Sequence, residues 1–183
     1  DYLKKKNKSN KKINPSEAFV KLITPTELTF AQIEQEELGK LLEQIVSNAE
    51  LKNIFRMDED KIEFQIRNNS IYEKLTDHAQ KYGHLTYGTS GPGNTVKDYI
   101  RILAGMARQD FDPKEIINTE KKKVQAIQQE ISRLKRELEL SAHEIRIFKT
   151  VRDSIWMKTY RKDHFYLWIK IADRIFIELG RRK

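Results

Sequence analysis

Two long segments at the end of the chain set its architecture. Residues 112–140 have the sequence DPKEIINTEKKKVQAIQQEISRLKRELEL, and residues 141–180 have the sequence SAHEIRIFKTVRDSIWMKTYRKDHFYLWIKIADRIFIELG. The first begins with an aspartate cap and a proline at the first helical position, where the missing amide hydrogen costs nothing. The second begins with Ser141 and Glu144 at the spacing of a capping box. Both segments are therefore predicted to be helices.

Apolar residues recur every three or four positions in the first of these helices, a heptad pattern about two repeats long. They are Val124, Ile127, Ile131, Leu134 and Leu138. This pattern is shorter than an isolated coiled coil needs, so a partner helix within the same chain is expected. The sequence predicts an all-α protein in which residues 111–183 form a long antiparallel helical hairpin with the two helices packed side by side.

A small helical subdomain is predicted over residues 15–110. Capping residues and apolar periodicity indicate helices near residues 29–48, 49–55, 70–82 and 95–109.

Two segments of this subdomain are ambiguous. Ile62, Phe64 and Ile66 alternate with polar residues as in a half-buried strand, but Ile62 and Ile66 also have helical spacing, so residues 61–67 fit a short strand or a helix. Residues 16–23 lie between two prolines and are too short to classify.

A glycine-rich crossover is predicted at residues 83–94, which hold four of the seven glycines. Glycine favours left-handed or extended backbone here. The segment lacks the motif of a Walker loop or a dinucleotide-binding loop, so a structural role is favoured. The alternative is a weak anion site formed by the backbone amides near Thr95, at the start of the next helix.

Arg161 and Lys162 lie among aromatic residues between Trp156 and Trp168. Such a mixture can bind phosphate or stack on bases. The favoured interpretation is a long helix with its aromatic stripe in the core and with Arg161 paired to an acid on a neighbouring helix. Arg161 and Lys162 join Thr95 as weak candidates for anion binding, and no catalytic residue is predicted.

No metal site is predicted, because the chain has no cysteine and no two of its four histidines have the spacing that places both on one helical face. His78 lies on an apolar stripe and is expected to be partly buried and hydrogen-bonded. Asp163 and His164 are expected to be solvated neighbours.

The formal charge of +8 is concentrated at the two ends of the chain. Residues 1–12 contain six lysines and one acid, residues 181–183 are all basic, and the rest is balanced. Residues 1–14 are predicted to be a flexible basic arm. A balanced body disfavours nucleic-acid binding, which requires charge concentrated on a folded element.

The composition predicts a soluble cytoplasmic protein. There is no cysteine for disulfides, no apolar run of the roughly 18 to 20 residues that span a bilayer, and no signal peptide, so no membrane partner is expected. The chain begins at Asp1 and its first methionine is Met57, which predicts that it is a processed product or a fragment of a longer protein.

Several short motifs resemble the central helical region of phosphoenolpyruvate-utilising enzymes related to pyruvate-water dikinase (phosphoenolpyruvate synthase). The matching residues are Leu22-Ile23-Thr24-Pro25 before Gln35-Glu36-Glu37, His78-Ala79-Gln80-Lys81-Tyr82-Gly83-His84-Leu85 before Gly91-Pro92, and Glu137-Leu138-Glu139-Leu140 before Tyr160-Arg161-Lys162-Asp163.

The resemblance implies a connector near the swivelling phosphohistidine domain that an ATP-grasp domain phosphorylates. The chain lacks the carrier motif Thr-Ser-His and the ATP-grasp glycine loop, so no catalytic position is carried over. A non-catalytic connector or accessory domain of such a phosphotransferase is the expectation. Its partners would be the other domains of the parent, and only the parent would need ATP and Mg²⁺.

Two alternatives of other classes remain. One is a module that binds nucleic acid or an anionic surface through the basic tail with Arg161, Lys162, Arg181 and Arg182. The other is a helical protein-interaction adaptor, which an exposed apolar patch of several hundred Å² would favour.

Overall fold

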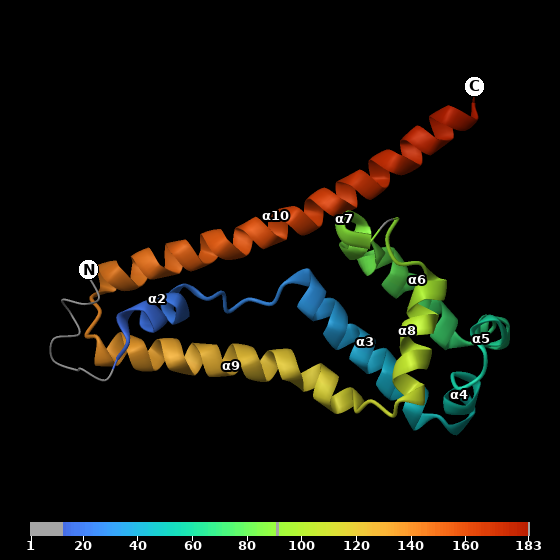
Figure 1. Cartoon of the computed structure of the whole chain (residues 1–183), viewed down its shortest axis with the longest axis horizontal. Coiled ribbons are helices and arrows are strands. Elements are labelled where there is room, and N and C mark those ends of the chain that lie inside the picture. The colour runs from blue at the N-terminus through green and yellow to red at the C-terminus, as the bar shows by residue number, and fades with distance from the viewer. Residues whose placement is uncertain (1–12, 91, 183) are drawn as a thin grey trace. The chain divides into compact units, whose positions relative to one another are not determined.

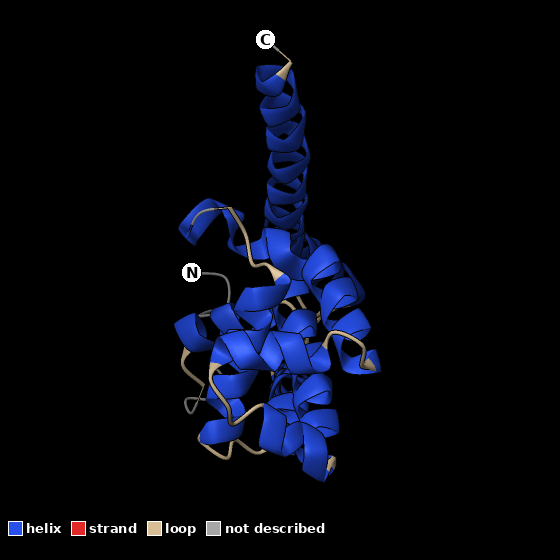
Figure 2. Cartoon of the chain, turned by 90° about the vertical axis from the view of Figure 1, so that its right-hand side faces the viewer, coloured by secondary structure: helices blue, strands red, loops and turns tan. Residues whose placement is uncertain are grey.

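A computed structural model of the chain describes residues 13–90 and 92–182. Every regular element among these residues is a helix, as Figure 2 shows, and this confirms the predicted all-α class. The chain divides into two compact units. The first unit combines the described residues up to Thr29 with Glu120–Tyr160, and the second combines Phe30–Thr119 with the residues from Arg161 onward. Each unit joins segments far apart in sequence, unlike the continuous domains 15–110 and 111–183 that the sequence suggested.

The first unit is built around α2 (Pro15–Ile23), which lies between α9 (Pro113–Glu137) and the first half of α10 (Ala142–Arg181) (Figure 1). Lys21 of α2 pairs with Glu130 of α9 at 2.8 Å, and the rings of Phe19 and Phe148 meet edge to face at 6.2 Å. The buried core of this unit is formed by Ala18, Leu22, Ile131, Leu134, Leu138 and Leu140.

The predicted direct packing of the two hairpin helices is therefore wrong, because a third helix, α2, lies between α9 and the first half of α10. A short turn joins α9 and α10, as expected, but the apolar residues of α9 pack against α2 instead of lying directly along α10. The first half of α10 also contacts α2, because the side chain of Arg152 donates a hydrogen bond to the carbonyl oxygen of Leu22 at 3.3 Å.

The helical state of α2 has a local cause that the sequence contained. The Asn14 side chain accepts hydrogen bonds from the amides of Ser16 at 3.0 Å and Glu17 at 3.5 Å, and Pro15 occupies the first helical turn. Ile13 packs against the core of the first unit. The predicted arm of residues 1–14 is thus corrected at its end, since Ile13 and Asn14 belong to the fold, and residues 1–12 lie outside the described residues.

The second unit contains the remaining helices. They are α3 (Phe30–Ser47), α4 (Ala49–Ile54), α5 (Glu59–Ile66), α6 (Ser70–Tyr82), the 3-10 helix η2 (Gly83–Thr86), α7 (Tyr87–Ser90) and α8 (Val96–Arg108). The predicted helices near residues 29–48, 49–55, 70–82 and 95–109 are confirmed. The cap of α6 is Asn69, whose side chain accepts from the Ile71 amide at 3.0 Å.

The ambiguous segment at residues 61–67 is helical, so the possible strand there is wrong. Ile62 and Ile66 are fully buried, whereas Phe64, between them in the sequence, is 78% exposed. A strand would place all three side chains on one face, while a helix separates Phe64 from the other two. Burial against α8 and α6 therefore decided what the alternating pattern left open.

The helix α10 is 40 residues long, and its start confirms the predicted capping box. The Ser141 amide donates to Glu144 Oε2 at 2.6 Å, and the Glu144 amide donates to Ser141 Oγ at 3.4 Å. Residues up to Tyr160 belong to the first unit, and residues from Arg161 onward belong to the second.

Candidate functional site

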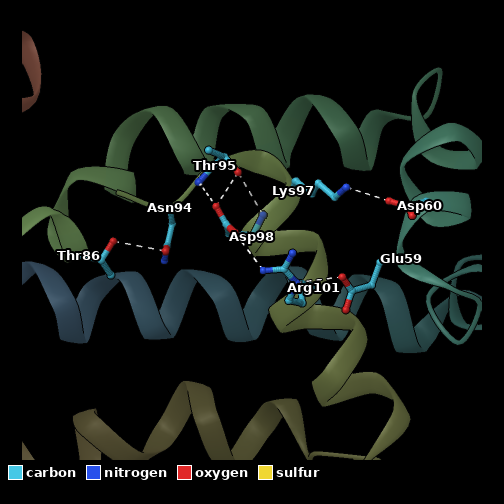
Figure 3. Close-up of polar contacts among 8 residues, drawn as sticks. All are labelled: Glu59, Asp60, Thr86, Asn94, Thr95, Lys97, Asp98 and Arg101. Carbon is cyan, nitrogen blue, oxygen red and sulfur yellow. Dashed lines mark hydrogen bonds and ion pairs between the residues drawn. The ribbon is translucent and has the colours of Figure 1, made fainter. Parts of the chain in front are cut away.

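The first candidate is the N-terminus of α8, where an anion site was predicted near Thr95. Figure 3 shows that Thr95 and Asp98 form a complete capping box. The Thr95 amide donates to Asp98 Oδ2 at 2.8 Å, and the Asp98 amide donates to Thr95 Oγ1 at 3.3 Å. Hydrogen bonds from Thr95 hold the pKa of Asp98 below its usual value. A carboxylate of the chain itself thus occupies donors that an external anion would use.

Cations near this helix end are also paired within the chain (Figure 3). Lys97 binds Asp60 at 2.8 Å, and Arg101 binds Glu59 at 2.9 Å. The hydrogen bond from Lys97 lowers the pKa of Asp60. The α8 terminus is therefore tied to α5 by exposed ion pairs, which contribute little individually.

The glycine-rich crossover is compact. Gly83 lies in a helical turn, and of the glycines described in this segment only Gly93, with φ +85°, has a positive φ, which corrects the expected left-handed or extended backbone. The Asn94 amide donates to the Gly83 carbonyl at 2.8 Å. A methyl group on Gly83 would lie 2.3 Å from the carbonyl oxygen of Asn94. Close approach of two backbones, more than torsion freedom, requires glycine at position 83.

The second candidate is the cationic pair on α10. Arg161 is exposed and has no ion-pair partner among the described residues, which differs from the predicted pairing with an acid on a neighbouring helix. The Lys162 ammonium lies 5.3 Å from the centre of the Tyr166 ring. In the described part of the chain no contact brings Thr95 together with Arg161 or Lys162, so the three predicted anion-binding residues do not form one site.

Asp163 differs from its predicted solvated state. Its side chain is 9% exposed, and its Oδ2 has no hydrogen-bond partner within the described residues. Burial raises the pKa of this carboxyl group above its usual value. The adjacent His164 contacts the ring of Phe30, with 5.4 Å between ring centres. Sequence analysis missed this buried carboxylate, because it belongs to the polar Arg-Lys-Asp-His run.

Two of the histidines, His78 and His84, are buried. His78 is 4% exposed, its Nε2 lies 3.3 Å from Glu34 Oε1, and its ring meets that of Tyr99 at 4.6 Å, which confirms the predicted buried, hydrogen-bonded state. His84 is 5% exposed, its Nδ1 lacks a partner, and burial lowers its pKa. Among the described residues no group of three His, Cys, Asp or Glu side chains could hold a metal ion.

A groove of about 400 Å³ lies between α3 and α6. It is lined by Glu37, Lys40, Leu41, Lys74, Asp77, His78 and Lys81. Lys81 pairs with Glu37 at 3.0 Å, and Lys74 donates to Gln44 at 2.6 Å. Lys40 also pairs with Glu36 at 2.8 Å, so all three lysines of the groove have partners within the chain.

The aromatic stripe of α10 differs between the two units. Trp156, in the first unit, is half-buried, stacks on Tyr160 with 4.8 Å between ring centres, and donates to the Leu28 carbonyl at 3.5 Å. Trp168, in the second unit, is 66% exposed. The expected core role is thus absent for the second half of the stripe. Its exposed apolar neighbours are Phe165, Ile171, Ile175, Phe176, Ile177 and Leu179.

Comparison with known proteins gave no match to any family model, curated protein or solved structure. Within residues 13–90 and 92–182, no helix combines the length and the apolar character required to cross a bilayer.

Proposed function

We propose that the chain is a non-catalytic helical connector of a larger phosphotransferase of the phosphoenolpyruvate-utilising type. The observation that carries the proposal is the division of α10, one uninterrupted helix that supplies Ala142–Tyr160 to one compact unit and the residues from Arg161 onward to the other. A continuous helix is a stiff element with a fixed rise of about 1.5 Å per residue. Such a helix suits a connector that must hold the domains attached to it at a fixed spacing.

The residues that carry the family resemblance have architectural surroundings, which supports a connector over a catalytic domain. Tyr82 and His84 are 1% and 5% exposed, and Gly83 is required by the close approach of Asn94. Tyr160 and Arg161 flank the point at which α10 changes unit. These positions serve packing and connection, and none of them combines a nucleophile with a neighbouring base.

The first experiment is incubation of the purified chain with Mg²⁺ and either labelled ATP or labelled phosphoenolpyruvate. The expected result is no nucleotide turnover and no phosphate on the chain. Stable incorporation of phosphate on a histidine, abolished by substitution of His78 or His84, would contradict the connector function.

The second experiment tests the parent enzyme. The reading frame that encodes the chain should also encode ATP-grasp and phosphohistidine segments. A reading frame that encodes neither segment would contradict the phosphotransferase part of the proposal. In that protein, replacement of the exposed residues Lys158, Arg161 and Lys162 by glycine should weaken the helix and reduce the overall transfer while the partial reaction with ATP persists. The control replaces the same three residues by alanine, which keeps the helix continuous and its length unchanged.

A second candidate is a helical protein-interaction adaptor. It is favoured by the exposed apolar residues of α10, since contiguous apolar patches of several hundred Å² mark interaction surfaces. Two findings together would favour the adaptor over the connector. One is a protein partner whose binding requires Trp168, and the other is a reading frame without phosphotransferase domains.

A further inference from the structure

The last four turns of α10 expose an apolar face. Phe165, Trp168, Ile175, Phe176 and Leu179 are each between 56% and 68% exposed. Their spacing of three and four residues, completed by Ala172, places them on one side of the helix. We call the set Phe165, Trp168, Ile169, Ala172, Ile175, Phe176 and Leu179 the α10 face.

A different side of the same helix segment is attached to the second unit. The Tyr87 hydroxyl donates to the Asp173 carboxylate, and the Tyr166 ring lies against Gly88 of α7. The Lys170 ammonium lies beside Gly83, 3.5 Å from the point that a methyl group there would occupy. These contacts leave the five large apolar side chains of the α10 face more than half exposed, while Ile169 and Ala172 are half-buried.

The α10 face has an internal symmetry about Ala172. Ile169 and Ile175 lie three positions before and after it, Trp168 and Phe176 lie four positions away, and Phe165 and Leu179 lie seven positions away. In an antiparallel pair of identical helices, a residue that precedes the centre by a given number of positions faces the residue that follows it by that number. Every layer of such a pair would be apolar, with no charged residue among the seven positions.

We infer that the α10 face binds the α10 face of a second copy of this chain in an antiparallel, two-fold symmetric pair. A two-fold interface requires one patch that is complementary to itself. The α10 face meets that requirement, and its centre is alanine, the smallest side chain of the set, where two helices approach most closely. An unrelated partner would not require matched residues on either side of a centre, which is why a second copy is favoured.

The area is adequate for a specific pair. Aromatic side chains bury roughly 150 to 250 Å² each, so three aromatic and two aliphatic residues that are more than half exposed offer on the order of 500 to 600 Å² per copy. The two copies together would bury about 1,000 to 1,200 Å², which reaches the roughly 1,000 Å² of a biological interface and lies in the range of weak, transient ones. The pair is therefore expected to be concentration-dependent.

The first test measures the mass of the purified chain by size exclusion with light scattering between about 1 and 100 µM. The expected mass rises with concentration to twice the 21.7 kDa of the chain. Trp168→Glu should leave the single-chain mass at every concentration. Phe64→Glu is the matched control, because Phe64 is at least as exposed as Trp168 and lies on α5 outside the α10 face, so it should leave the dimer intact. Helical circular dichroism of each variant checks that it folds.

The second test determines direction and register with single cysteines, for which the natural chain has no background. With a short bismaleimide, Ala172→Cys should cross-link to itself. Phe165→Cys should not, because its two copies would be 14 residues, or about 21 Å, apart along the pair. A mixture of Phe165→Cys and Leu179→Cys should cross-link.

Three results would overturn the inference. They are a single-chain mass at 100 µM, a dimer that Trp168→Glu leaves unchanged, and efficient cross-linking of Phe165→Cys to itself, which would indicate parallel helices. A partner of another kind that covers the face would appear as a single-chain mass for the purified chain, so it also counts against the pair. None of these results depends on the phosphotransferase assay.

Discussion

The apolar seam of α9 and the α10 face have the same three- and four-residue spacing and opposite surroundings. In α9, Ile131 and Leu134 are 3% and 1% exposed, because α2 covers them. In α10, Trp168 and Phe176 are 66% and 68% exposed, and no described element covers them. Apolar periodicity therefore indicates that a helix face needs a partner, but it does not say where the partner lies.

The largest expected effect separates the two seams directly. Leu134→Ala should destabilise the first unit by about 2 to 5 kcal/mol, because it leaves a cavity between α9 and α2. Trp168→Ala should cost less than about 1 kcal/mol at concentrations that keep the chain single, since the ring has little packing to lose. Urea denaturation followed by circular dichroism measures both. Equal losses would mean that the two seams are buried alike and would remove the contrast.

The next effect concerns the crossover against which the polar side of α10 docks. Gly83→Ala should destabilise the second unit by about 1 to 3 kcal/mol, because its methyl group would lie 2.3 Å from the Asn94 carbonyl oxygen. Gly105→Ala is the control within α8, where nothing lies within 4 Å, and it should stabilise by about 0.5 to 1 kcal/mol. Thermal unfolding of the two variants should shift in opposite directions, and a neutral Gly83→Ala would show that the crossover yields without strain.

A smaller effect is expected at the start of α2, the helix that covers the α9 seam. Asn14→Ala removes the side-chain acceptor for the Ser16 amide and should cost about 1 kcal/mol. Hydrogen exchange should then increase at the amides of the first turn of α2 while α3 is unchanged. Asn14→Ser, which retains a side-chain acceptor and adds no charge beside Glu17, is the matched control and should cost much less than Asn14→Ala.

The smallest expected effect is a stabilisation that depends on pH, and it concerns Asp163 on the second half of α10. Asp163 is buried with one oxygen unpartnered, and its pKa is raised from the ordinary value of 3.8, so the folded chain binds this proton more tightly than the unfolded chain. Burial of the ionised Asp163 carboxylate lowers the free energy of unfolding. This destabilisation is complete at pH values above the raised pKa, and it disappears as the pH falls to the ordinary pKa of 3.8. Asp163→Asn should therefore stabilise by about 0.5 to 1 kcal/mol at pH 7.

The gain from Asp163→Asn should shrink on acidification, which urea denaturation at pH 7 and pH 4.5 measures. Asp153→Asn is the control on the first half of α10, where the carboxylate pairs with Lys149 at 2.5 Å in an exposed position. A gain at Asp163 that does not change with pH would assign the effect to something other than its buried charge.

Much of the fold followed from local signals. The capping boxes at Thr95 and Ser141 and the Asp112-Pro113 start are all local hydrogen-bonding or steric devices, and each helix begins where they predict. The Asn14-Pro15 start of α2 has the same kind of capping signal, but the segment between Pro15 and Pro25 is too short to be classified from its periodicity. Predicting a helix there would have identified α2 as the helix that covers the apolar residues of α9.

The candidate site was less predictable, because contacts between distant residues decide it. Thr95 has the expected cap, but its pairing with Asp98 competes with an anion. The burial of Asp163 beside the exposed Arg161 and Lys162 depends on which side of α10 docks, whereas the sequence predicted solvent around Asp163 and an ion pair for Arg161. The position of His78 was predictable because it lies on an apolar stripe of its own helix.

The sequence by itself determined the helices, their ends and the faces that need burial, because capping and periodicity act within a few residues of the chain. Tertiary structure alone decided that α2 covers α9, that residues 61–67 are helical, and that the apolar side of α10 is the one left uncovered. These outcomes depend on competition among apolar surfaces for the same partners, and local sequence does not encode which surface wins.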